Sequence, residues 1–296
     1  MKQIQRIDQN GITRKYEKDI LTRHIRGELE YLTFPLLDEC DCVKHLFSTR
    51  LGGVSQGCYG TMNLSTNGEE DRAVILENYR RIAAVLDEPL DRFVKSKQTH
   101  TTNVLQVTGE DAGKGIVREL TYTDVDGLIT NEPGLVLTTT YADCVPLYFV
   151  DPVHIAIGLS HSGWRGTVGK MGQATLEAMR NAFDTDPKDV LCCIGPSICK
   201  DCYEVSEDVK EAFEEAFASC KHLLREGETL YTENGNGKYQ LDLWTANKLV
   251  LLAVGVTPEH IQITDICTCC NPEYLHSHRA SHGKRGLLGA FLVLTQ

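Results

Sequence analysis

The stretch GLITNEPGLVLTTTYADCVPLYFVDPVHIAIGLSHSGWRG, residues 127–166, indicates the fold class of this chain. Apolar and β-branched residues fill runs at 135–140, 145–150 and 154–160, and each run has the length of a strand. Pro146 falls inside the second run. Because proline has no N–H to donate to a sheet, we predict an edge strand or a bulge there.

Apolar residues recur every three or four positions on both sides of this stretch. The pattern predicts helices over 71–86, 168–183, 206–220 and 243–254, with Thr167 as the N-cap of the second. Further strands are predicted over 29–34, 43–49, 93–97, 103–107, 191–195, 261–266 and 287–294, and a long loop over 51–68. Helices and strands alternate with no linker between them, so we predict one domain of the α+β or α/β class.

The composition is that of a globular protein. The chain has 296 residues, 42% of them hydrophobic, which is enough for a sizeable core. Its net charge of -11 argues against a general nucleic-acid binder. No leader-like apolar segment and no run near the ~20 apolar residues of a membrane span is visible. We therefore expect a cytoplasmic protein, whose twelve cysteines are thiols, metal ligands or catalytic groups.

Three metal-ligating side chains fall at the predicted ends of strands. They are His100 in KQTH, Cys144 in ADC and His161 in SHSGWRG. Their long separations differ from the local spacing of zinc fingers and suit a catalytic site gathered from several loops. Two histidines and one cysteine are a common set of zinc ligands that leaves a fourth position open to water. Zinc there lowers the pKa of the water toward ~7.

Each of these residues also has a plainer interpretation. A cysteine on an apolar strand is usually a small core residue, and a histidine near a turn is often a solvated or capping group. The flanking residues favour the metal site. Asp143 precedes Cys144, and a carboxylate beside a thiolate needs a partner or a role. Trp164 and Arg165 follow His161 at a predicted helix start, where an anion could bind.

Further cysteines and histidines cluster elsewhere. Cys199 and Cys202 form a C-x-x-C, and Cys267, Cys269 and Cys270 form a C-x-C-C. Together these could make a structural zinc site. The C-x-C-C spacing is unusual, however, and we favour buried thiols. In the histidine-rich segment 276–282 we expect His276 and His282 to lie on the surface.

Several long segments resemble one known family. They are FSTRLGGVSQGCYGTMNLS (47–65), KQTH (97–100), DVDGLIT (124–130), ADCVPL (142–147), HSGWRGT (161–167), IGPSICKDCYEV (194–205) and SHR (277–279). Together they resemble the YfiH-like family, whose members are called multicopper polyphenol oxidases or laccase domain proteins, peptidoglycan editing factors and purine nucleoside phosphorylases. The resemblance covers residues 45–296, while residues 1–45 carry no family motif and form a peripheral segment.

The resemblance implies a fold and an activity. The expected fold is a single-domain, four-layer α/β/β/α arrangement of the α+β class with mixed sheets. Family members hold zinc on residues matching His100, Cys144 and His161. They carry out phosphorolysis of adenosine, inosine and methylthioadenosine to the free base and ribose 1-phosphate, and they deaminate adenosine. The implied ligands are thus a purine nucleoside, phosphate and zinc, with no nucleic-acid or membrane partner, and the chain is a monomer or a small homo-oligomer.

The resemblance also implies roles for residues around the metal. The residues that it assigns to catalysis are Lys97, Asp143, Cys144 and Arg165, and those that it assigns to substrate or phosphate are Arg50, Asn63, Arg165, His278 and Arg279. The chain departs from the family pattern near its end. Where the family has an arginine in a G-K-T-G-R run, this sequence has Leu287, and Arg285 comes two residues earlier.

Three other functions remain alternatives. A copper-dependent polyphenol oxidase, with copper in place of zinc, needs many histidines, yet the chain has ten, with one H-x-H pair. A hydrolase acting on peptidoglycan precursors could use Cys144 as the nucleophile and His161 as the base. A non-catalytic zinc protein would instead have a closed set of four ligands.

Overall fold

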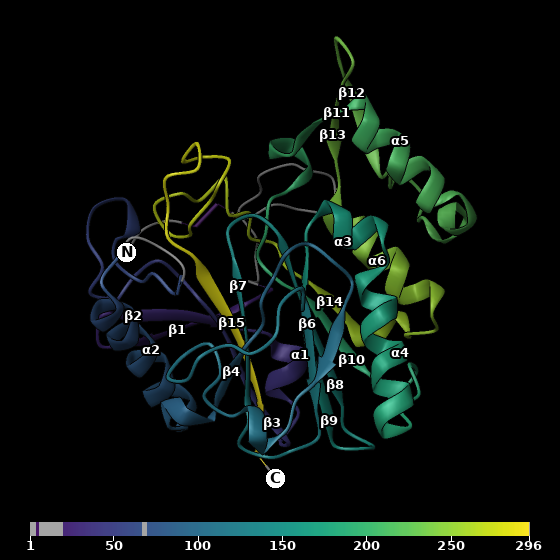
Figure 1. The fold of residues 1–296 in the computed structure, drawn as a ribbon. Coiled ribbons are helices and arrows are strands. Elements are labelled where there is room, and N and C mark those ends of the chain that lie inside the picture. The colour runs from purple at the N-terminus through teal and green to yellow at the C-terminus, as the bar shows by residue number, and fades with distance from the viewer. Residues whose placement is uncertain (1–3, 6–19, 67–69, 296) are drawn as a thin grey trace.

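The computed structural model describes residues 4–5, 20–66 and 70–295 (Figure 1). The helices are α1 (Pro35–Asp38), α2 (Arg72–Leu86), α3 (Trp164–Val168), α4 (Met171–Phe183), α5 (Glu207–Ala216) and α6 (Leu243–Ala253). The strands are β1 (Thr22–Arg26), β2 (Leu29–Thr33), β3 (Val43–Ser48), β4 (Phe93–Lys95), β5 (Val104–Gln106), β6 (Gly127–Thr130), β7 (Val136–Tyr141), β8 (Val145–Asp151), β9 (Ala156–Ser162), β10 (Leu191–Ile194), β11 (Glu204–Ser206), β12 (Tyr231–Gly235), β13 (Lys238–Leu241), β14 (Ile261–Ile263) and β15 (Leu288–Leu294). None of the described helices is long and apolar enough to span a membrane.

Most of the strands belong to two six-stranded sheets. Sheet A has the order β1-β2-β3-β15-β7-β4, and sheet B has the order β14-β10-β8-β9-β6-β5. Each is mixed, because β4 runs parallel to β7 in sheet A, and β5–β6 and β10–β14 are parallel pairs in sheet B. A small sheet, β11-β13-β12, lies apart from both at the top of Figure 1.

Alternating side chains of the strands separate the core into layers. In β15, Leu292 packs between the two sheets with Leu137 and Leu159, whereas Phe291 points to the other face and packs against Tyr79 of α2. Sheet A therefore has α2 on its outer face and sheet B on its inner face (Figure 1).

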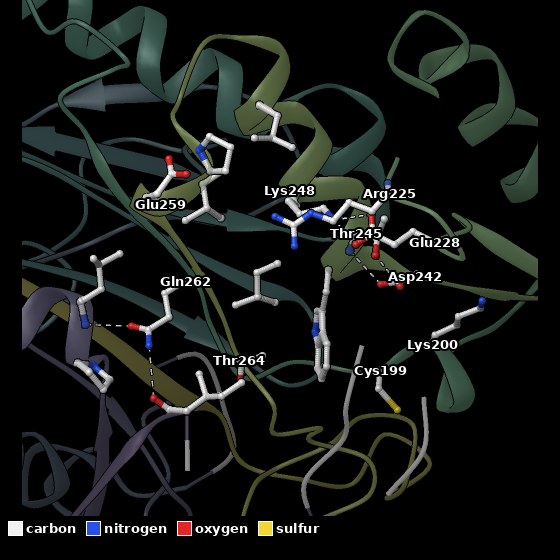
Figure 2. Close-up of a pocket in the computed structure, with 18 of the residues that line it drawn as sticks. Cys199, Lys200, Arg225, Glu228, Asp242, Thr245, Lys248, Glu259, Gln262 and Thr264 are labelled. Carbon is white, nitrogen blue, oxygen red and sulfur yellow. Dashed lines mark hydrogen bonds and ion pairs between the residues drawn. The ribbon is translucent and has the colours of Figure 1, made fainter. Parts of the chain in front are cut away.

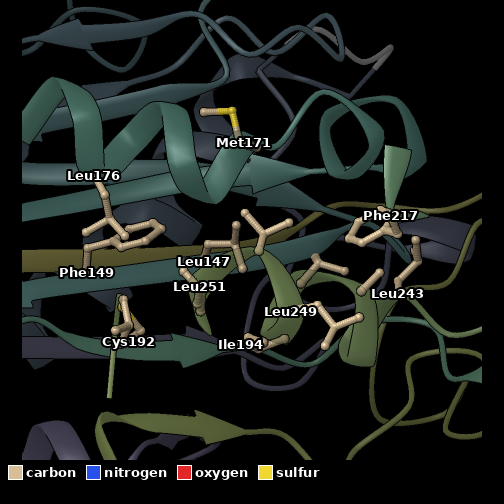
Figure 3. Packing of buried hydrophobic residues seen from close by; sticks show 14 of the residues in the cluster. Leu147, Phe149, Met171, Leu176, Cys192, Ile194, Phe217, Leu243, Leu249 and Leu251 are labelled. Carbon is tan, nitrogen blue, oxygen red and sulfur yellow. The ribbon is translucent and has the colours of Figure 1, made fainter. Parts of the chain in front are cut away.

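The outer face of sheet B is covered by α4 and α6. Leu147 and Phe149 of β8 pack there against Leu176 and Leu249 of the two helices (Figure 3). The order of layers is thus helix, sheet, sheet, helix, which confirms the predicted α/β/β/α arrangement of the α+β class.

Two local predictions are wrong. Pro146 lies in β8, an interior strand between β9 and β10, and not at an edge or a bulge. The strand tolerates it because pairing with β10 begins only at Leu147. The predicted helix 168–183 corresponds to α4, which begins three residues later at Met171, but its predicted N-cap is wrong because Thr167 belongs to the separate short helix α3. Thr167 lies inside α3 and caps nothing: its hydroxyl donates to the carbonyl of Gly163, and Gly163 is the N-cap.

Two histidines are buried and neutral. The backbone N–H of Phe34 donates to Nε2 of His45 at 2.7 Å, so this nitrogen carries no proton. Burial, with a smaller effect of the charge of His24, lowers the pKa of His45 to about 3. This holds although Nε2 of His45 is 4.0 Å from Oδ1 of Asp38. Burial also lowers the pKa of His276 to about 3, and its Nε2 donates to the carbonyl of Met62. The expectation that His276 is a surface residue is wrong, whereas His282 is exposed as expected.

These histidines predict a loss of stability in mild acid. Their folded-state pKa values lie below the ordinary value of about 6.5, so the unfolded state binds more protons between roughly pH 6.5 and 3. The stabilisation is present above pH 6.5 and falls as the pH decreases, on the order of a few kcal/mol in all. We expect the melting temperature to decrease from pH 7 to pH 4, and to decrease less steeply in His45→Gln. The variant His222→Gln, at an exposed position, is the control. An unchanged slope in His45→Gln would contradict the assignment.

Candidate metal centre

The three predicted metal ligands meet where the chain passes from sheet A to sheet B. His100 lies in the loop from β4 of sheet A to β5 of sheet B, and Cys144 lies in the short turn from β7 of sheet A to β8 of sheet B. His161 is near the end of β9, which pairs with β8 opposite Pro146. The topology of the two sheets therefore gathers residues that are far apart in sequence.

The geometry of these side chains suits a single metal ion. One ligand atom from each of His100, Cys144 and His161 lies within 4.8 Å of the others. The sulfur of Cys144 is 3.9 Å from Nε2 of His100, and the imidazole rings of the two histidines are 5.0 Å apart at 79°. His161 is buried, Cys144 is half-buried and His100 is exposed. The set is thus closed toward the core and open on one side.

Asp126 holds two of the ligands in place. Its carboxylate accepts hydrogen bonds from the backbone N–H groups of Thr99, His100 and Thr101 and, at 2.8 Å, from Nδ1 of His161. Burial raises its pKa, but these bonds and the charge of His161 outweigh burial and lower the pKa to about 2. The Nδ1 bond leaves Nε2 of His161 for a metal. Asp126 belongs to the family-like segment DVDGLIT, but no role was predicted for it from the sequence. Its one available signal was an acidic residue directly before an apolar strand.

Cys144 and His161 shift each other's protonation. Burial raises the pKa of the Cys144 thiol, but the charge of His161 and bonds to both histidines lower it to about 6. Burial lowers the pKa of His161, but Cys144 and Asp126 raise it to about 9. The pair favours a thiolate, which is the form that binds a metal or acts as a nucleophile.

The neighbouring residue Asp143 is fixed by both of its carboxylate oxygens. Oδ1 accepts from the hydroxyl of Thr268 at 2.6 Å, and Oδ2 accepts from the backbone N–H of Arg279 at 2.7 Å. The backbone of Asp143 is in the left-handed region, with φ of 88°, which aspartate adopts more readily than most residues. This turn places Asp143 and Cys144 side by side at the mouth of the site.

Cationic side chains surround this mouth. Arg165 is exposed and stacks on Trp164, with its Cζ 4.3 Å from the ring centroid. The phenol of Tyr203 lies within electrostatic range of Cys144, Asp143, Arg165 and Arg279. Arg279 is less free, because its guanidinium donates to two backbone carbonyls at 3.1 and 2.9 Å. His278, the other member of this predicted pair, is exposed.

Arg285 is a further cation at the site. Burial lowers its pKa, and the charges of Asp143 and Cys144 raise it, so the guanidinium lies within electrostatic range of both. Its Nε is buried and has no hydrogen-bond partner among the described residues. In the sequence, Arg285 stands two residues before the family's arginine position, which is Leu287 here. The structure nevertheless places a positive charge from this segment beside the metal ligands.

Two of the predicted substrate residues are committed to the protein itself. Arg50 donates to the carbonyls of Gly60 and Pro272. Asn63 is fully buried, and its amide donates to Glu70 while its oxygen accepts from the backbone N–H of Leu287. Both side chains tie the 50–66 loop to other segments of the chain.

Lys97 lies at a different cavity, of about 320 Å³. This cavity is also lined by Arg72, Lys95 and Arg118 and by one carboxylate, Glu119, so its basic side chains outnumber its acidic one. Burial, with a smaller effect of Lys97, lowers the pKa of Lys95 to about 7. Lys97 is three residues from His100, and the loop that carries both connects this cavity with the candidate metal centre.

A separate cavity of about 490 Å³ opens beside α6 (Figure 2). Its polar walls are largely paired: Lys248 donates to both carboxylate oxygens of Glu228, and Asp242 accepts from Thr245 at the start of α6. His100, Cys144 and His161 are not among its lining residues. It is therefore distinct from the candidate metal centre.

Gly163 offers a test of the ligand geometry. A Cβ atom at this position would lie 2.9 Å from Cδ2 of His100 and 3.0 Å from the sulfur of Cys144. We expect Gly163→Ala to displace both ligands and to weaken metal binding by about tenfold or more, as loss of ligand support does in other metal sites. Gly166→Ala is the matched control, because its Cβ would meet nothing closer than 3.6 Å. Equal metal affinity in the two variants, measured by competition with a chelator, would contradict this geometry.

Comparisons with known proteins show relatives that match most of this chain. The chain is 36% identical over 246 residues to purine nucleoside phosphorylase YlmD of Geobacillus stearothermophilus, covering 83% of this chain and 88% of that protein. It is 34% identical over 265 residues to a purine nucleoside phosphorylase of Bacteroides thetaiotaomicron, covering 88% and 95%.

Two solved structures are also similar to this chain. The crystal structure of YlmD from Geobacillus stearothermophilus matches with a TM-score of 0.84 and 33% identity, over 94% of this chain and all of that one. The YfiH protein of Bacillus licheniformis matches with a TM-score of 0.83 and 27% identity, over 92% and 98%. Residues 44–295 match the family described as multi-copper polyphenol oxidoreductase laccase, and the chain belongs to that family.

Proposed function

We propose that this protein is a zinc-dependent purine nucleoside enzyme. It would cleave adenosine, inosine or methylthioadenosine with phosphate to the free base and ribose 1-phosphate, and it would also deaminate adenosine. The observation that carries the proposal is the open three-ligand set of His100, Cys144 and His161 beneath a mouth lined by arginines. The names of the relatives, which are purine nucleoside phosphorylases, support the same substrates.

The ligand set favours zinc over copper. One thiolate and two imidazoles with an open side are typical of catalytic zinc, which supplies Lewis acid chemistry to an oxygen in its open position. A multicopper oxidase needs several histidines near one another. Within the described residues, His276 is buried with its Nε2 bound to the Met62 carbonyl, and it does not join the site.

The arginines at the mouth are suited to phosphate. Arg165 is exposed and oriented by Trp164, and Arg285 offers a buried Nε that has no hydrogen-bond partner in the part of the chain that the structure describes. Guanidinium groups bind phosphate through paired N–H donors. In phosphorolysis, a phosphate oxygen forms a bond to C1′ of the ribose while the bond from C1′ to the purine breaks. The purine leaves with the bonding electrons and gains a proton.

Asp143 is our candidate for moving that proton. The hydroxyl of Thr268 and the N–H of Arg279 orient its carboxylate beside Cys144, and each oxygen keeps a second acceptor position. Lys97 and the cavity around it are a further candidate for holding phosphate or ribose. In this proposal Arg50 and Asn63 shape the site from the 50–66 loop, whereas His278 and Arg279 border it.

A second candidate is a cysteine hydrolase acting on a peptidoglycan precursor. Cys144, His161 and Asp126 are arranged as a nucleophile, a base and a group that orients the base. The two candidates differ in the reactivity of the thiolate. A sulfur bound to zinc is alkylated slowly by iodoacetamide, whereas a free catalytic thiolate reacts quickly.

The decisive experiment is turnover of adenosine with and without phosphate, with products separated by chromatography. We expect adenine and ribose 1-phosphate only when phosphate is present, and inosine in both samples. Cys144→Ala should abolish both reactions, and Cys58→Ala, at an exposed cysteine, should retain them. If the zinc-loaded protein forms no purine product, or if Cys144→Ala is fully active, the proposal is wrong.

Asp126 should control zinc affinity without touching the metal. In Asp126→Asn an uncharged amide replaces the carboxylate that accepts from Nδ1 of His161. We expect zinc affinity to fall by about 10- to 100-fold. The control is Asp124→Asn, because the Asp124 carboxylate accepts from the hydroxyl of Thr99 and not from His161. Zinc competition titrations on both variants, with melting curves to verify folding, measure the effect. A similar affinity in the two variants would remove Asp126 from this role.

A further inference from the structure

Four cysteines outside the candidate metal centre converge on one point. The sulfurs of Cys199, Cys202, Cys267 and Cys270 lie within 4.8 Å of one another. The first two belong to the turn after β10, and the other two belong to the turn after β14. Because β10 and β14 are parallel neighbours, their carboxyl ends lie at the same edge of sheet B, and the two C-x-x-C turns face each other there.

The spacing of the sulfurs is that of ligands sharing one ion. The sulfur of Cys270 is 3.4 Å from that of Cys202 and 3.9 Å from that of Cys199. Four thiolates placed tetrahedrally at 2.3 Å from zinc lie about 3.8 Å apart. A disulfide needs about 2.05 Å, and all twelve cysteines are free.

Backbone N–H groups around the cluster favour the thiolate form of one cysteine. Cys267 is fully buried, and its sulfur accepts hydrogen bonds from the N–H groups of Cys199 at 3.2 Å and of Cys270 at 3.4 Å. Such bonds stabilise negative charge on the sulfur. Several thiolates at this separation repel one another unless a cation lies among them. A metal ion at the centre of the four sulfurs would supply that cation and would satisfy all four at once.

We infer that Cys199, Cys202, Cys267 and Cys270 form a second, structural zinc site, separate from the one at Cys144. Four sulfur ligands from the protein make a closed set, with no position left for substrate. Thiolates select zinc over magnesium, calcium and manganese. From the sequence we treated C-x-C-C as one unit and therefore favoured simple buried thiols. In the structure, Cys267 and Cys270 act as a C-x-x-C pair, and Cys269 is not part of the group.

The ion would stabilise the wall of the candidate metal centre. Thr268 lies between the two cysteines of the second turn, and its hydroxyl donates to Asp143 beside Cys144. On the first turn, the N–H of Ile198 donates to the carbonyl of Asp143. Cys199 also lies at the edge of the cavity beside α6 (Figure 2). A single ion thus links two turns that both support the Asp143–Cys144 corner.

Metal content of the full chain tests this inference. After expression with zinc and dialysis, we expect two zinc ions per chain in the unaltered protein and one in Cys202→Ser. The matched control is Cys269→Ser, a half-buried cysteine next to two of the ligands, which should keep both ions. Cys144→Ala should keep one. If the site at Cys144 binds no zinc, the unaltered chain will hold one ion, and Cys202→Ser but not Cys144→Ala will lose it.

X-ray absorption at the zinc edge identifies the ligands even if Cys202→Ser fails to fold. In Cys144→Ala the remaining zinc should have four sulfur neighbours at about 2.3 Å and no nitrogen. Removal of this ion by a chelator should lower the melting temperature by several degrees. Three results would overturn the inference: no zinc in Cys144→Ala, zinc with nitrogen ligands there, or a disulfide between these cysteines in the mass spectrum of the unreduced protein.

Discussion

Asp126 carries a negative charge with no exposed surface, and the protein satisfies that charge with groups from two separate segments. Three successive amide groups at 99–101 point at its carboxylate, and the imidazole of His161 does so from β9. A buried carboxylate without such partners would cost several kcal/mol. The same bonds that make its burial possible therefore bring the loop of His100 next to the strand of His161. Cys144 enters from the third side, where β7 turns into β8.

The candidate metal centre lies at the edge of sheet B where the chain crosses over from sheet A. Both loops that leave sheet A for sheet B carry a ligand, and the strand ends of sheet B supply the rest. The cysteine turns after β10 and β14 lie at this edge too, because β10 pairs with β8 near Leu147, a few residues after Cys144. One edge of sheet B thus holds the open ligand set, the closed cysteine set and the Asp143 corner between them.

The sequence predicts much of this fold, but less of the site. Long apolar patterns placed α2, α6, β7, β8 and β15 correctly, and the resemblance to a family supplied the order of layers. The small sheet of β11, β12 and β13 was missed because its residues are mostly polar. The predicted helix over 168–183 begins three residues before α4, because the apolar spacing continues across Lys170, where the left-handed backbone separates α3 from α4.

Within the site, the sequence identified residues by what their side chains can bind, but it did not show which residues pair with one another. His100, Cys144 and His161 were chosen because they can bind metal, and the fold brings them together. Asp126 and Arg285 were missed or set aside, since their roles depend on hydrogen bonds and charges between distant segments. Arg50 and Asn63 were chosen as substrate ligands by type, and the structure adds that both side chains also bond to other parts of the protein.

The position of β15 has a consequence for how this molecule acquires its structure. This strand lies near the end of the sequence but in the middle of sheet A, between β3 and β7. Its partner residues in β3 are more than two hundred positions earlier in the chain. Pairings of such range are slow to form, because a long loop must close before any contact compensates for the lost entropy. During synthesis, β3 and β7 therefore remain without the strand that joins them, and sheet A is completed among the last features of the fold.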